Sequence, residues 1–291
     1  MQENYIVSER YLITGCNGQL GQVLQKAYPK ATALGKDDLD ISDEKQVQGI
    51  DWSKYDVIIN AAAYVNADHS ETDEGRERTW QSNAVGPRNL AKAAIENDIH
   101  LIHISSEYVF DGTIKNHHED EPFTPLSVYG QTKSAGDLVV SLVPKHHIIR
   151  TSWVVGDGHN FVKTMKNLAD MRIDPKVVDD QYGRLTFTSE LARAIDYIIN
   201  NNVEYGTYNL SNSGEIKSWA AIAKDVFELA GHDRDRVTPI STDEYRANKH
   251  PFAPRPTYSD MDLSKIQRAG FESYDYEPLL REYVEGLGVV K

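Results

Sequence analysis

The sequence is poor in cysteine, has no excess of positive charge and contains no long apolar run. Cys16 is the only cysteine among 291 residues, so an internal disulfide cannot form, which indicates a reducing compartment. Asp and Glu (44) outnumber Lys and Arg (31), for a formal net charge of −13. This acidity argues against nucleic acid or an anionic membrane as the main partner. Because no apolar stretch is long enough for a signal peptide or a membrane span, we expect a soluble cytoplasmic protein.

Histidine and acidic residues cluster once, in the run 117–121 (HHEDE). Adjacent residues cannot easily converge on one metal ion, and a proline follows the run. We interpret the run as a solvated loop and expect no metal site. His146 and His147, which precede a predicted strand, are interpreted as a turn.

A glycine-rich turn follows the first predicted strand, residues 11–14. Gly15, Gly18 and Gly21 lead into a predicted helix over 22–27. In dinucleotide-binding folds, the first such glycine permits a tight turn and the second lets the backbone approach a pyrophosphate. The third lets the helix pack on the strand. An ordinary loop would also tolerate three glycines, but the strand before them and the helix after them favour a dinucleotide site.

The first charged side chain after the second predicted strand (31–34) bears on the choice of cofactor. An acidic residue there binds the ribose 2′-hydroxyl of NAD, whereas a cation accommodates the 2′-phosphate of NADP. Lys36 comes first and favours NADPH, although Asp37 and Asp38 follow at once, so NADH is also compatible with the pattern. Ser42 is the predicted N-cap of the next helix.

Two further predicted strands end in small or hydroxyl-bearing residues. Residues 56–63 (DVIINAAA) end on three alanines, and residues 100–104 lead into Ser105 and Ser106. Ligands of doubly wound sheets lie beyond the carboxyl ends of the strands, where small side chains leave room for a cofactor. A serine hydroxyl at this edge can also fix a substrate carbonyl. Tight helix–sheet packing would equally explain the alanines, and a turn or cap the serines.

Tyr129 and Lys133 are four residues apart and share one face of a predicted helix. An unperturbed phenol titrates near ~10 and is a ready proton donor at neutral pH. A nearby ammonium favours the phenolate, so we expect Lys133 to lower the pKa of Tyr129. The pair can protonate a carbonyl oxygen or deprotonate an alcohol. The spacing also suits an ordinary solvent-facing pair, but the upstream glycine turn, alanines and serines favour the catalytic interpretation.

These motifs occur in the order found in extended short-chain dehydrogenase/reductases, and the chain resembles the dTDP-4-dehydrorhamnose reductase family among them. The resemblance extends from residue 11 to about residue 271. The stretches that carry it are Thr14-Gly15-x-x-Gly18-x-x-Gly21, Leu39-Asp40-Ile41, Asn60-Ala61-Ala62-Ala63, Ser105-Ser106, Tyr108-Val109-Phe110-Asp111-Gly112, Pro125-Leu126-Ser127-Val128-Tyr129-Gly130 with Lys133, Arg150-Thr151-Ser152-Trp153, Asn160-Phe161-Val162-Lys163-Thr164-Met165, Asp180-Gln181-Tyr182-Gly183 and Arg255-Pro256-x-x-Ser259.

The resemblance implies NADPH-dependent reduction of the C4 keto group of dTDP-4-dehydro-6-deoxy-L-mannose (dTDP-4-dehydrorhamnose) to dTDP-L-rhamnose, a step in nucleotide-sugar and polysaccharide biosynthesis. The family's catalytic residues map onto Ser106, which steadies the carbonyl oxygen, Tyr129, the proton donor, and Lys133, which binds the nicotinamide ribose. The implied cofactor contacts are Gly15, Asn17, Gly18, Gln19, Leu20, Gly21, Lys36, Asp40, Ile41, Ala61, Ala62, Ala63, Asn83, Tyr129 and Lys133. The implied substrate contacts are Ser106, Glu107, Tyr108, Trp153, Asn160 and Arg255.

Four positions depart from the family's usual residues. Glu107 replaces an aspartate, His69 a lysine, Leu185 a proline and His159 an asparagine. They surround the implied sugar and nucleotide pocket, so the exact sugar stays open. A sugar dehydratase needs two acids after the hydroxyl residue, and Tyr108 in the second place disfavours it. Two other interpretations are kept: a non-catalytic NADP-binding regulatory subunit resembling methionine adenosyltransferase β, and an epimerase or reductase of another sugar nucleotide.

We expect a doubly wound parallel Rossmann-type α/β sheet with a smaller C-terminal α/β substrate lobe. Residues 1–151 form the predicted dinucleotide-binding domain, with 172–205 packing back onto it, and residues 152–171 and 206–291 form the predicted substrate-binding lobe. Further predicted elements are helices 161–170, 189–200 and 219–230 (capped by Ser218), strands 176–179 and 206–210, and an irregular loop over 239–256. The expected partner is a dTDP-linked sugar, and the protein is expected to be a monomer or a homodimer.

Overall fold

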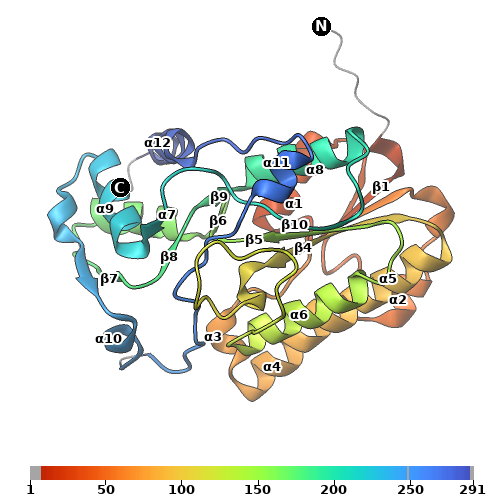
Figure 1. Ribbon diagram of the computed structural model, residues 1–291, viewed down its shortest axis with the longest axis horizontal. Helices are drawn as coiled ribbons and strands as arrows, with labels where there is room; N and C mark the ends of the chain where they lie inside the picture. Colours follow the sequence, from red (N-terminus) through yellow and green to blue (C-terminus); the bar gives the residue numbers. More distant parts are fainter. Residues whose placement is uncertain (1–7, 248, 289–291) are drawn as a thin grey trace, which may run out of the picture.

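A parallel β-sheet forms the centre of the molecule. The structure, a computed structural model, describes residues 8–247 and 249–288. Within these residues, six parallel strands form the central sheet in the order β10-β5-β4-β3-β1-β2 (Figure 1). They are β1 (Tyr11–Thr14), β2 (Thr32–Leu34), β3 (Val57–Asn60), β4 (His100–Ser106), β5 (His146–Thr151) and β10 (Gly206–Asn209). This order confirms the predicted doubly wound α/β fold.

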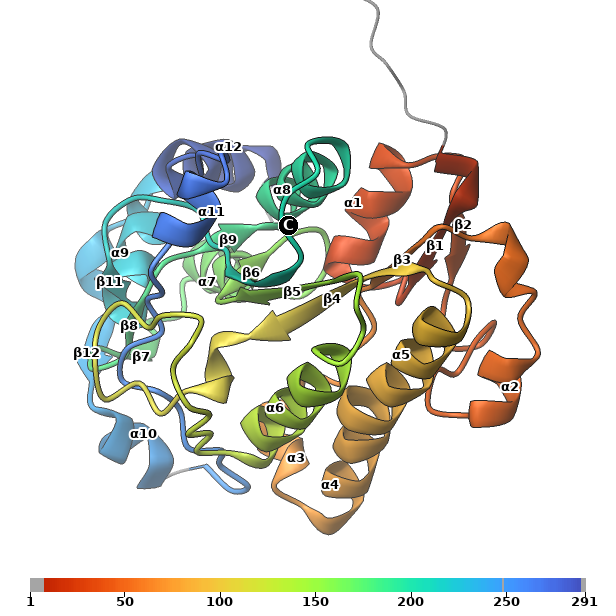
Figure 2. The ribbon, with the colours of Figure 1, turned by 45° about the vertical axis from the view of Figure 1, so that its right-hand side comes forward.

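Helices cover both faces of this sheet (Figure 2). On one face, α1 (Gln19–Ala27) packs against α8 (Thr188–Asn200). On the other, α5 (Gly86–Glu96) and α6 (Val128–Val140) pack on β4. The shorter helices of this part are η1 (Ser8–Arg10), α2 (Glu44–Gln48), η2 (Trp52–Lys54), α3 (Ala67–Ser70), α4 (Asp73–Trp80), the π-helix η3 (Gln81–Val85), η4 (Glu107–Val109) and α11 (Ser264–Arg268).

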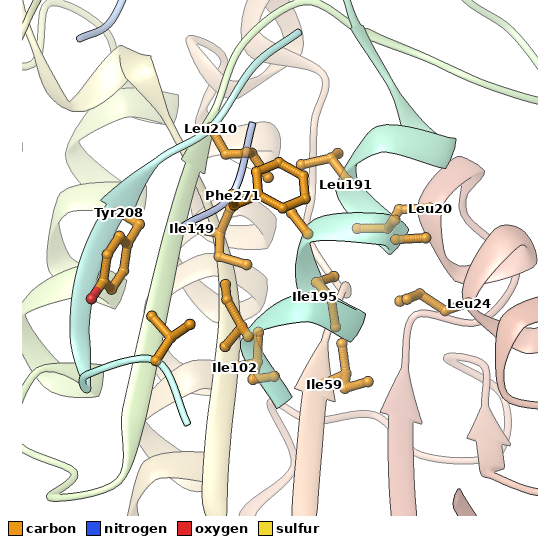
Figure 3. Close-up of a cluster of buried hydrophobic side chains, with 14 of the residues drawn as sticks. Leu20, Leu24, Ile59, Ile102, Ile149, Leu191, Ile195, Tyr208, Leu210 and Phe271 are labelled. Carbon is orange, nitrogen blue, oxygen red and sulfur yellow. The ribbon is translucent and has the colours of Figure 1, made fainter. Parts of the chain in front are cut away.

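The larger hydrophobic core lies between α8, α1 and the sheet (Figure 3). Leu191 and Ile195 are four residues apart and so lie on one apolar face of α8. This face packs on Ile59, Ile102 and Ile149, which come from three neighbouring strands. All five side chains are fully buried, and each contributes roughly 1.5–3 kcal/mol by leaving water. The sheet that carries the site is therefore anchored from this side.

The smaller lobe consists of short strand pairs and helices around a second hydrophobic core. The pairs are β7 (Lys176–Val178) with β12 (Thr238–Ile240), β8 (Tyr182–Gly183) with β11 (Lys217–Ser218), and β6 (Val154–Val155) with β9 (Thr186–Phe187). The helices are α7 (Phe161–Asp170), α9 (Trp219–Leu229), η5 (Arg234–Arg236), α10 (Thr242–Ala247) and α12 (Tyr276–Gly286). In the described parts of the chain, no helix combines the length and apolar character needed to cross a bilayer.

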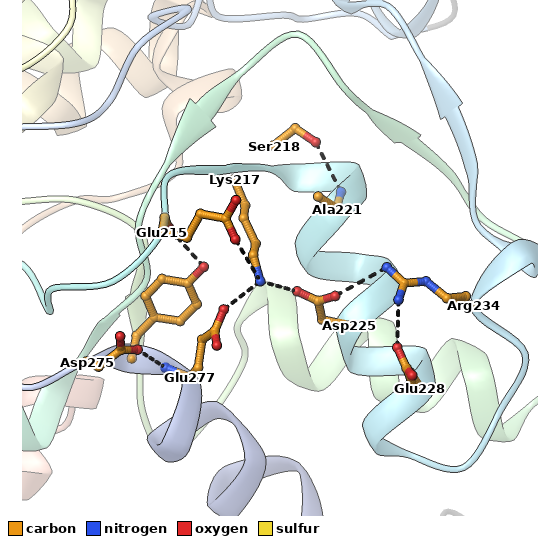
Figure 4. Close-up of polar contacts among 10 residues, drawn as sticks. Glu215, Lys217, Ser218, Ala221, Asp225, Glu228, Arg234, Asp275 and Glu277 are labelled. Carbon is orange, nitrogen blue, oxygen red and sulfur yellow. Dashed lines mark hydrogen bonds and ion pairs between the residues drawn. The ribbon is translucent and has the colours of Figure 1, made fainter.

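A polar cluster ties the helices of this lobe together (Figure 4). Lys217 Nζ lies 2.9 Å from Asp225 Oδ2 on α9 and 2.7 Å from Glu277 Oε1 on α12. Arg234 extends the cluster by pairing with Glu228, with 2.7 Å between NH1 and Oε2. The carboxylates raise the pKa of Lys217 against the opposing effect of its burial. The lysine therefore stays charged and links β11 to both helices.

The two lobes are interleaved along the chain, and the expected domain ranges need correction at several segments, among them α11, which packs on the larger lobe although residues 206–291 were expected in the smaller one. Residues 206–209, expected in the smaller lobe, form β10 at the edge of the central sheet. Residues 176–178, expected to pack onto the larger domain, pair instead with β12 of the smaller lobe. Pairing between distant strands is not encoded in local sequence patterns, which explains both differences. α8, also within 172–205, does pack on α1.

Most predicted elements are present, and two predicted caps have different outcomes. Ser218 caps α9 as predicted, because its Oγ accepts a hydrogen bond from the Ala221 N–H at 3.1 Å. The predicted cap at Ser42 is wrong. Asp43 caps α2 by accepting from the backbone N–H groups of Lys45 and Gln46, since its carboxylate reaches both.

Three segments are more ordered than predicted. His146 and His147 belong to strand β5 and do not form a turn. His117 is buried, and its Nδ1 lies 2.7 Å from Glu121 Oε2, so this run is not simply a solvated loop. Part of the predicted irregular loop forms β12 and α10. In each case tertiary packing outweighs the polar or proline-containing local sequence.

Replacing Ile195 with alanine tests the larger core. We expect Ile195→Ala to lower the free energy of unfolding by about 2–5 kcal/mol, because it leaves a cavity between α8 and the sheet. Ile95→Ala on α5 is the matched control, since that side chain is 50% exposed, and its effect should stay within about 0.5 kcal/mol. Urea denaturation followed by circular dichroism measures both. Equal losses for the two variants would contradict this description of the core.

Candidate active site

Three adjoining cavities form one cleft along the carboxyl edge of the sheet. The first, of about 220 Å³, is lined by Gly15, Asn17, Gly18, Gly35, Lys36, Leu39, Asp40, Ile41, Ala61, Ala62, Ala63 and Ser82. The second, of about 570 Å³, contains Ser106, Glu107, Tyr129 and Lys133, and it shares Gly18, Ala61 and Ala63 with the first. The third, of about 440 Å³, lies against the smaller lobe and shares Tyr108, Trp219 and Arg255 with the second. The cleft therefore runs from the glycine turn to the smaller lobe.

The glycine turn is shaped for a close approach of backbone to ligand. Gly15 has a φ of +72°, and a Cβ there would lie 2.6 Å from Ala62 Cα. A Cβ on Gly21 would lie 2.2 Å from the Gly15 carbonyl oxygen, so α1 could not pack this closely on the turn. Gly18 is the N-cap residue of α1 and has no side chain with which to cap it. The first N–H groups of α1 are thus available to an anionic group such as a pyrophosphate.

Lys36 and Asp40 are the charged residues that line the first cavity within the described chain. Lys36 is highly exposed, and its Nζ lies 3.9 Å from Asp40 Oδ2. The Asp40 carboxylate also accepts hydrogen bonds from the Ser42 N–H and Oγ. Asp38 turns back to accept from the Gly35 N–H at 3.0 Å. Lys36, the one cation among the described residues that line this cavity, is therefore exposed and makes no short ion pair there.

Helix α6 and the end of β4 bring the three predicted catalytic residues into the second cavity. Ser127 starts α6 by capping the Gly130 N–H at 3.2 Å, which presents Tyr129 in the first turn. Lys133, one turn later, is 1% exposed, and its Nζ donates to the Ile104 carbonyl at 2.6 Å. Ser106 lies close enough to Tyr129 to influence its pKa.

The protonation states in this cavity are set mainly by burial. Burial and the nearby Glu107 raise the pKa of Tyr129, and the neighbouring Ser106 hydroxyl opposes the rise. Burial lowers the pKa of Lys133 to about 8. The pKa of Tyr129 is thus raised and not lowered as predicted, because burial dominates while the Lys133 ammonium donates to the Ile104 carbonyl. The phenol stays protonated at neutral pH and can serve as a proton donor.

Glu107 adds an acid to this cavity. Its side chain is buried, and its Oε2 accepts a hydrogen bond from Ser106 Oγ at 2.8 Å. Burial raises the pKa of Glu107 to about 7, although Ser106 and Ser259 partly offset the effect. Glu107 therefore titrates near neutral pH beside Ser106 and Tyr129.

The predicted substrate residues lie in the second and third cavities. Arg255 lines both, and its NH2 donates to Asp68 Oδ1 at 2.8 Å. The Trp153 ring stacks on Trp219 with 3.5 Å between centroids and lines the second cavity. Asn160 lines the third cavity and also caps α7, because its Oδ1 accepts from the Lys163 N–H.

Like Gly21, Asn83 is a predicted cofactor contact that does not line the cleft. Its side chain is buried, accepting from the Tyr64 N–H at 2.8 Å and donating to the Tyr64 carbonyl at 2.9 Å. It lines none of the three cavities described above. Asn83 thus fixes the backbone of Tyr64, the residue directly after the three alanines, without lining the cleft.

Sequence reasoning missed several residues of the cleft. Gln181, Trp219 and Tyr245 line the third cavity, and Asp68 anchors Arg255. Trp219, Tyr245 and Asp68 stand outside the motifs that carry the resemblance, and only packing between the lobes brings them together with Gln181. Within the described residues, no group of three or more His, Cys, Asp or Glu side chains is arranged to hold a metal ion.

Comparison with known proteins identifies the family. The family model described as the RmlD substrate binding domain matches residues 9–288. The dTDP-4-dehydrorhamnose reductase of Mycolicibacterium smegmatis is 39% identical over 91% of this chain and 81% of its own length. The chain belongs to the dTDP-4-dehydrorhamnose reductase family. This membership confirms the resemblance drawn from the sequence.

Two further relatives are informative, one through its bound cofactor and the other through the substrate in its name. The crystal structure of a dTDP-4-dehydrorhamnose reductase from Bacillus anthracis in complex with NADP is similar, with a TM-score of 0.85 and 35% identity over 96% of this chain and 98% of that one. A dTDP-4-keto-6-deoxy-D-glucose reductase from Streptomyces niveus is 32% identical over 91% of this chain and 92% of its own length. The family thus includes reductases named for different 4-keto sugars.

The raised pKa of Glu107 predicts a pH-dependent stability. An unfolded glutamate titrates near ~4.3, and the folded one near 7. Between these values the folded state holds a proton that the unfolded state has lost, so stability falls by roughly 1.4 kcal/mol per pH unit as the pH rises. Glu107→Gln removes this contribution, and its stability relative to wild type should therefore increase between pH 5 and pH 8.

Urea midpoints of both proteins at pH 5 and pH 8 measure this difference. Other titrating groups, such as the buried histidines, contribute equally to both proteins and cancel. If the difference in stability between wild type and Glu107→Gln stays constant over this range, the pKa of Glu107 is not raised by burial.

Proposed function

We propose that the protein catalyses the NADPH-dependent reduction of dTDP-4-dehydrorhamnose to dTDP-L-rhamnose. The observation that carries the proposal is the convergence of Ser106, Tyr129 and Lys133 on a cavity continuous with the glycine turn. Family membership supports it. We expect the reaction in the cytoplasm, where the thiol of Cys16 stays reduced.

The residues present fit a reduced dinucleotide. The glycine turn and the N-terminus of α1 would bind the pyrophosphate, and Lys36 would bind the 2′-phosphate. Ala61–Ala63 would leave room for the cofactor, and Asp40 and Ile41 would line the adenosine end. When bound, NADPH supplies the hydride for the sugar C4.

The side chains around the second cavity would divide the work of proton transfer. Tyr129, protonated at neutral pH, would give its phenol proton to the oxygen that becomes the C4 hydroxyl. Ser106 would hold that oxygen by a hydrogen bond and fix its approach. Lys133 would bind the nicotinamide ribose and favour the phenolate left on Tyr129. Glu107 would accept a hydrogen bond from the Ser106 hydroxyl, as it does in this structure.

The third cavity would take the nucleotide part of the substrate. Arg255 lies where the second and third cavities meet, so a diphosphate between sugar and nucleoside could bind its guanidinium. The ring of Trp153 and the phenol of Tyr108 would border the sugar, and Asn160 the nucleotide. Asp68 would keep Arg255 oriented until the diphosphate binds.

A second candidate substrate is another dTDP-linked 4-keto-6-deoxyhexose. The relative named for dTDP-4-keto-6-deoxy-D-glucose favours it, because that protein is 32% identical to this one. Of the four departures from the family's usual residues, Glu107 lines the second cavity and His159 the third, whereas His69 and Leu185 line neither. The relatives reported above are reductases, which favours this activity over a regulatory subunit or an epimerase.

NADPH oxidation, followed at 340 nm, across a panel of sugar nucleotides tests the function. We expect turnover with dTDP-4-dehydrorhamnose and slower or no turnover with UDP-linked and non-keto sugars. Faster reduction of a D-configured 4-keto sugar would establish the second candidate. No oxidation with any 4-keto sugar nucleotide would refute a reductase function.

Tyr129→Phe tests the proton donor. We expect turnover to fall by about 10²–10⁴-fold, the usual contribution of general acid catalysis, while the affinity for NADPH changes little. Tyr208→Phe is the matched control, since Tyr208 is a buried tyrosine of β10 whose hydroxyl donates to the Glu204 carbonyl. Steady-state kinetics and NADPH fluorescence titration measure the two effects. Unchanged turnover in Tyr129→Phe would remove this residue from the mechanism.

Lys36→Glu tests the recognition of the 2′-phosphate. Reversing the charge should weaken NADPH by roughly tenfold relative to NADH, because a phosphate then faces a carboxylate. Lys54→Glu is the control, as Lys54 is similarly exposed and precedes β3 at the opposite edge of the sheet. The ratio of the two dissociation constants is the measurement. An unchanged ratio would show that Lys36 does not contact the phosphate.

A further inference from the structure

Lys133 is a buried cation whose charge has no direct counterion in the described chain. The side chain is 1% exposed, and its Nζ donates to a neutral acceptor, the Ile104 carbonyl. No ion pair of Lys133 occurs among the described residues. Taking an ammonium out of water is costly unless an opposite charge compensates it. Something nearby must keep this lysine protonated.

Asp137 is the carboxylate in the right place. It lies one helical turn beyond Lys133 on α6, as Lys133 lies one turn beyond Tyr129, so the three residues follow one face of the helix. Asp137 is 1% exposed. Its negative charge raises the pKa of Lys133, opposing the larger lowering by burial. Sequence reasoning stopped at Lys133 and did not extend to this third residue.

Arg150 of β5, the strand beside β4, holds Asp137 by a buried ion pair. Its Nε donates to Asp137 Oδ2 at 2.9 Å, and its NH1 donates to the Glu119 carbonyl at 2.9 Å. The rings of Phe110 and Phe123 lie 5.2 and 5.1 Å from the guanidinium carbon. Burial raises the pKa of Asp137, and Arg150 counteracts that rise. The Arg150 guanidinium thus favours the carboxylate form of Asp137.

The other titratable groups near Lys133 do not replace this charge. His103 of β4 is fully buried, and burial together with Lys133 lowers its pKa, so its ring is neutral. Tyr129 is a protonated phenol at neutral pH. Glu107 stands beside Ser106 and acts on Tyr129.

We propose that Asp137, held by Arg150, is a positioning residue that keeps Lys133 in its charged form within the cleft. The charge on Lys133 does not depend on the proposed function, but the use that the enzyme makes of this charge rests on it. Without Asp137, the pKa of Lys133 would fall further below its ordinary value, and a smaller fraction of the lysine would be an ammonium able to bind a ribose hydroxyl or stabilise a phenolate on Tyr129.

The titration of Lys133 itself provides the test, with no substrate present. In protein labelled with ¹³Cε-lysine, the Lys133 resonance is assigned from its loss in Lys133→Met, and its shift is followed with pH. Asp137→Asn should lower the midpoint by about one pH unit or more, for charges ~6 Å apart at an effective dielectric constant of ~20. Asp137→Glu, which keeps the charge, should hold the midpoint within a few tenths of a unit.

A double variant distinguishes the shift of the Lys133 midpoint from unfolding and from the effect of leaving Arg150 buried without a carboxylate partner. Asp137→Asn/Arg150→Met removes the buried ion pair as a unit, which proteins often tolerate, and its Lys133 midpoint should fall as in the single variant. Asp170→Asn, which removes a buried carboxylate beside Lys166 in the smaller lobe, should leave Lys133 unaffected. An unchanged Lys133 midpoint in the double variant would overturn the proposal, whether or not the single variant folds.

Enzyme assays then show what the charge is used for. In the double variant, the alkaline limb of the kcat/KM profile should move to lower pH by the same amount as the Lys133 midpoint. A Lys133 midpoint that shifts in a protein whose wild type reduces no 4-keto sugar nucleotide would refute the proposed function and leave this inference standing.

Discussion

A chain of buried hydrogen bonds fixes the carboxyl ends of three neighbouring strands, and the cleft depends on it. Thr14 Oγ1 donates to Asn60 Oδ1 at 2.7 Å, and Asn60 Nδ2 lies 2.9 Å from His103 Nδ1. Because the amide nitrogen donates, Nδ1 of His103 is the acceptor, and the ring is neutral. The Ala62 N–H also donates to Asn60 Oδ1. One asparagine thereby aligns β1, β3 and β4 where their ligand-facing segments begin.

Each main part of the cleft starts within a few residues of this chain. Gly15 follows Thr14, the alanines follow Asn60, and Ser106 follows His103 on the same strand. The parallel register then sets their relative positions, with Thr14 opposite Asn60 and Asn60 opposite His103. The smaller lobe supplies the remaining wall. Its contact with the larger lobe includes Asp68, which binds both Arg255 and Lys249.

Much of the fold could be predicted from local patterns. Apolar strands ending in glycine, alanine or serine predicted the central sheet, and the four-residue spacing of Tyr129 and Lys133 predicted their common helix face. Burial and long-range contacts decided the rest. His117 and His147 look solvent-exposed by residue type, yet tertiary contacts bury them. The pKa of Tyr129 depends on where the Lys133 ammonium points, which spacing alone does not determine.

The interleaving of the two lobes means that neither can be cut out as one continuous piece. The chain leaves the central sheet after β5, builds part of the smaller lobe, returns as β10, and leaves again before α11 comes back to cover that strand. A fragment ending at residue 151 would lack β10 and expose the edge of β5, with its buried Ile148 and Ile149. Unpaired strand edges of this kind recruit other chains. The polypeptide therefore has to extend to residue 209 of 291 before its nucleotide-binding sheet is complete.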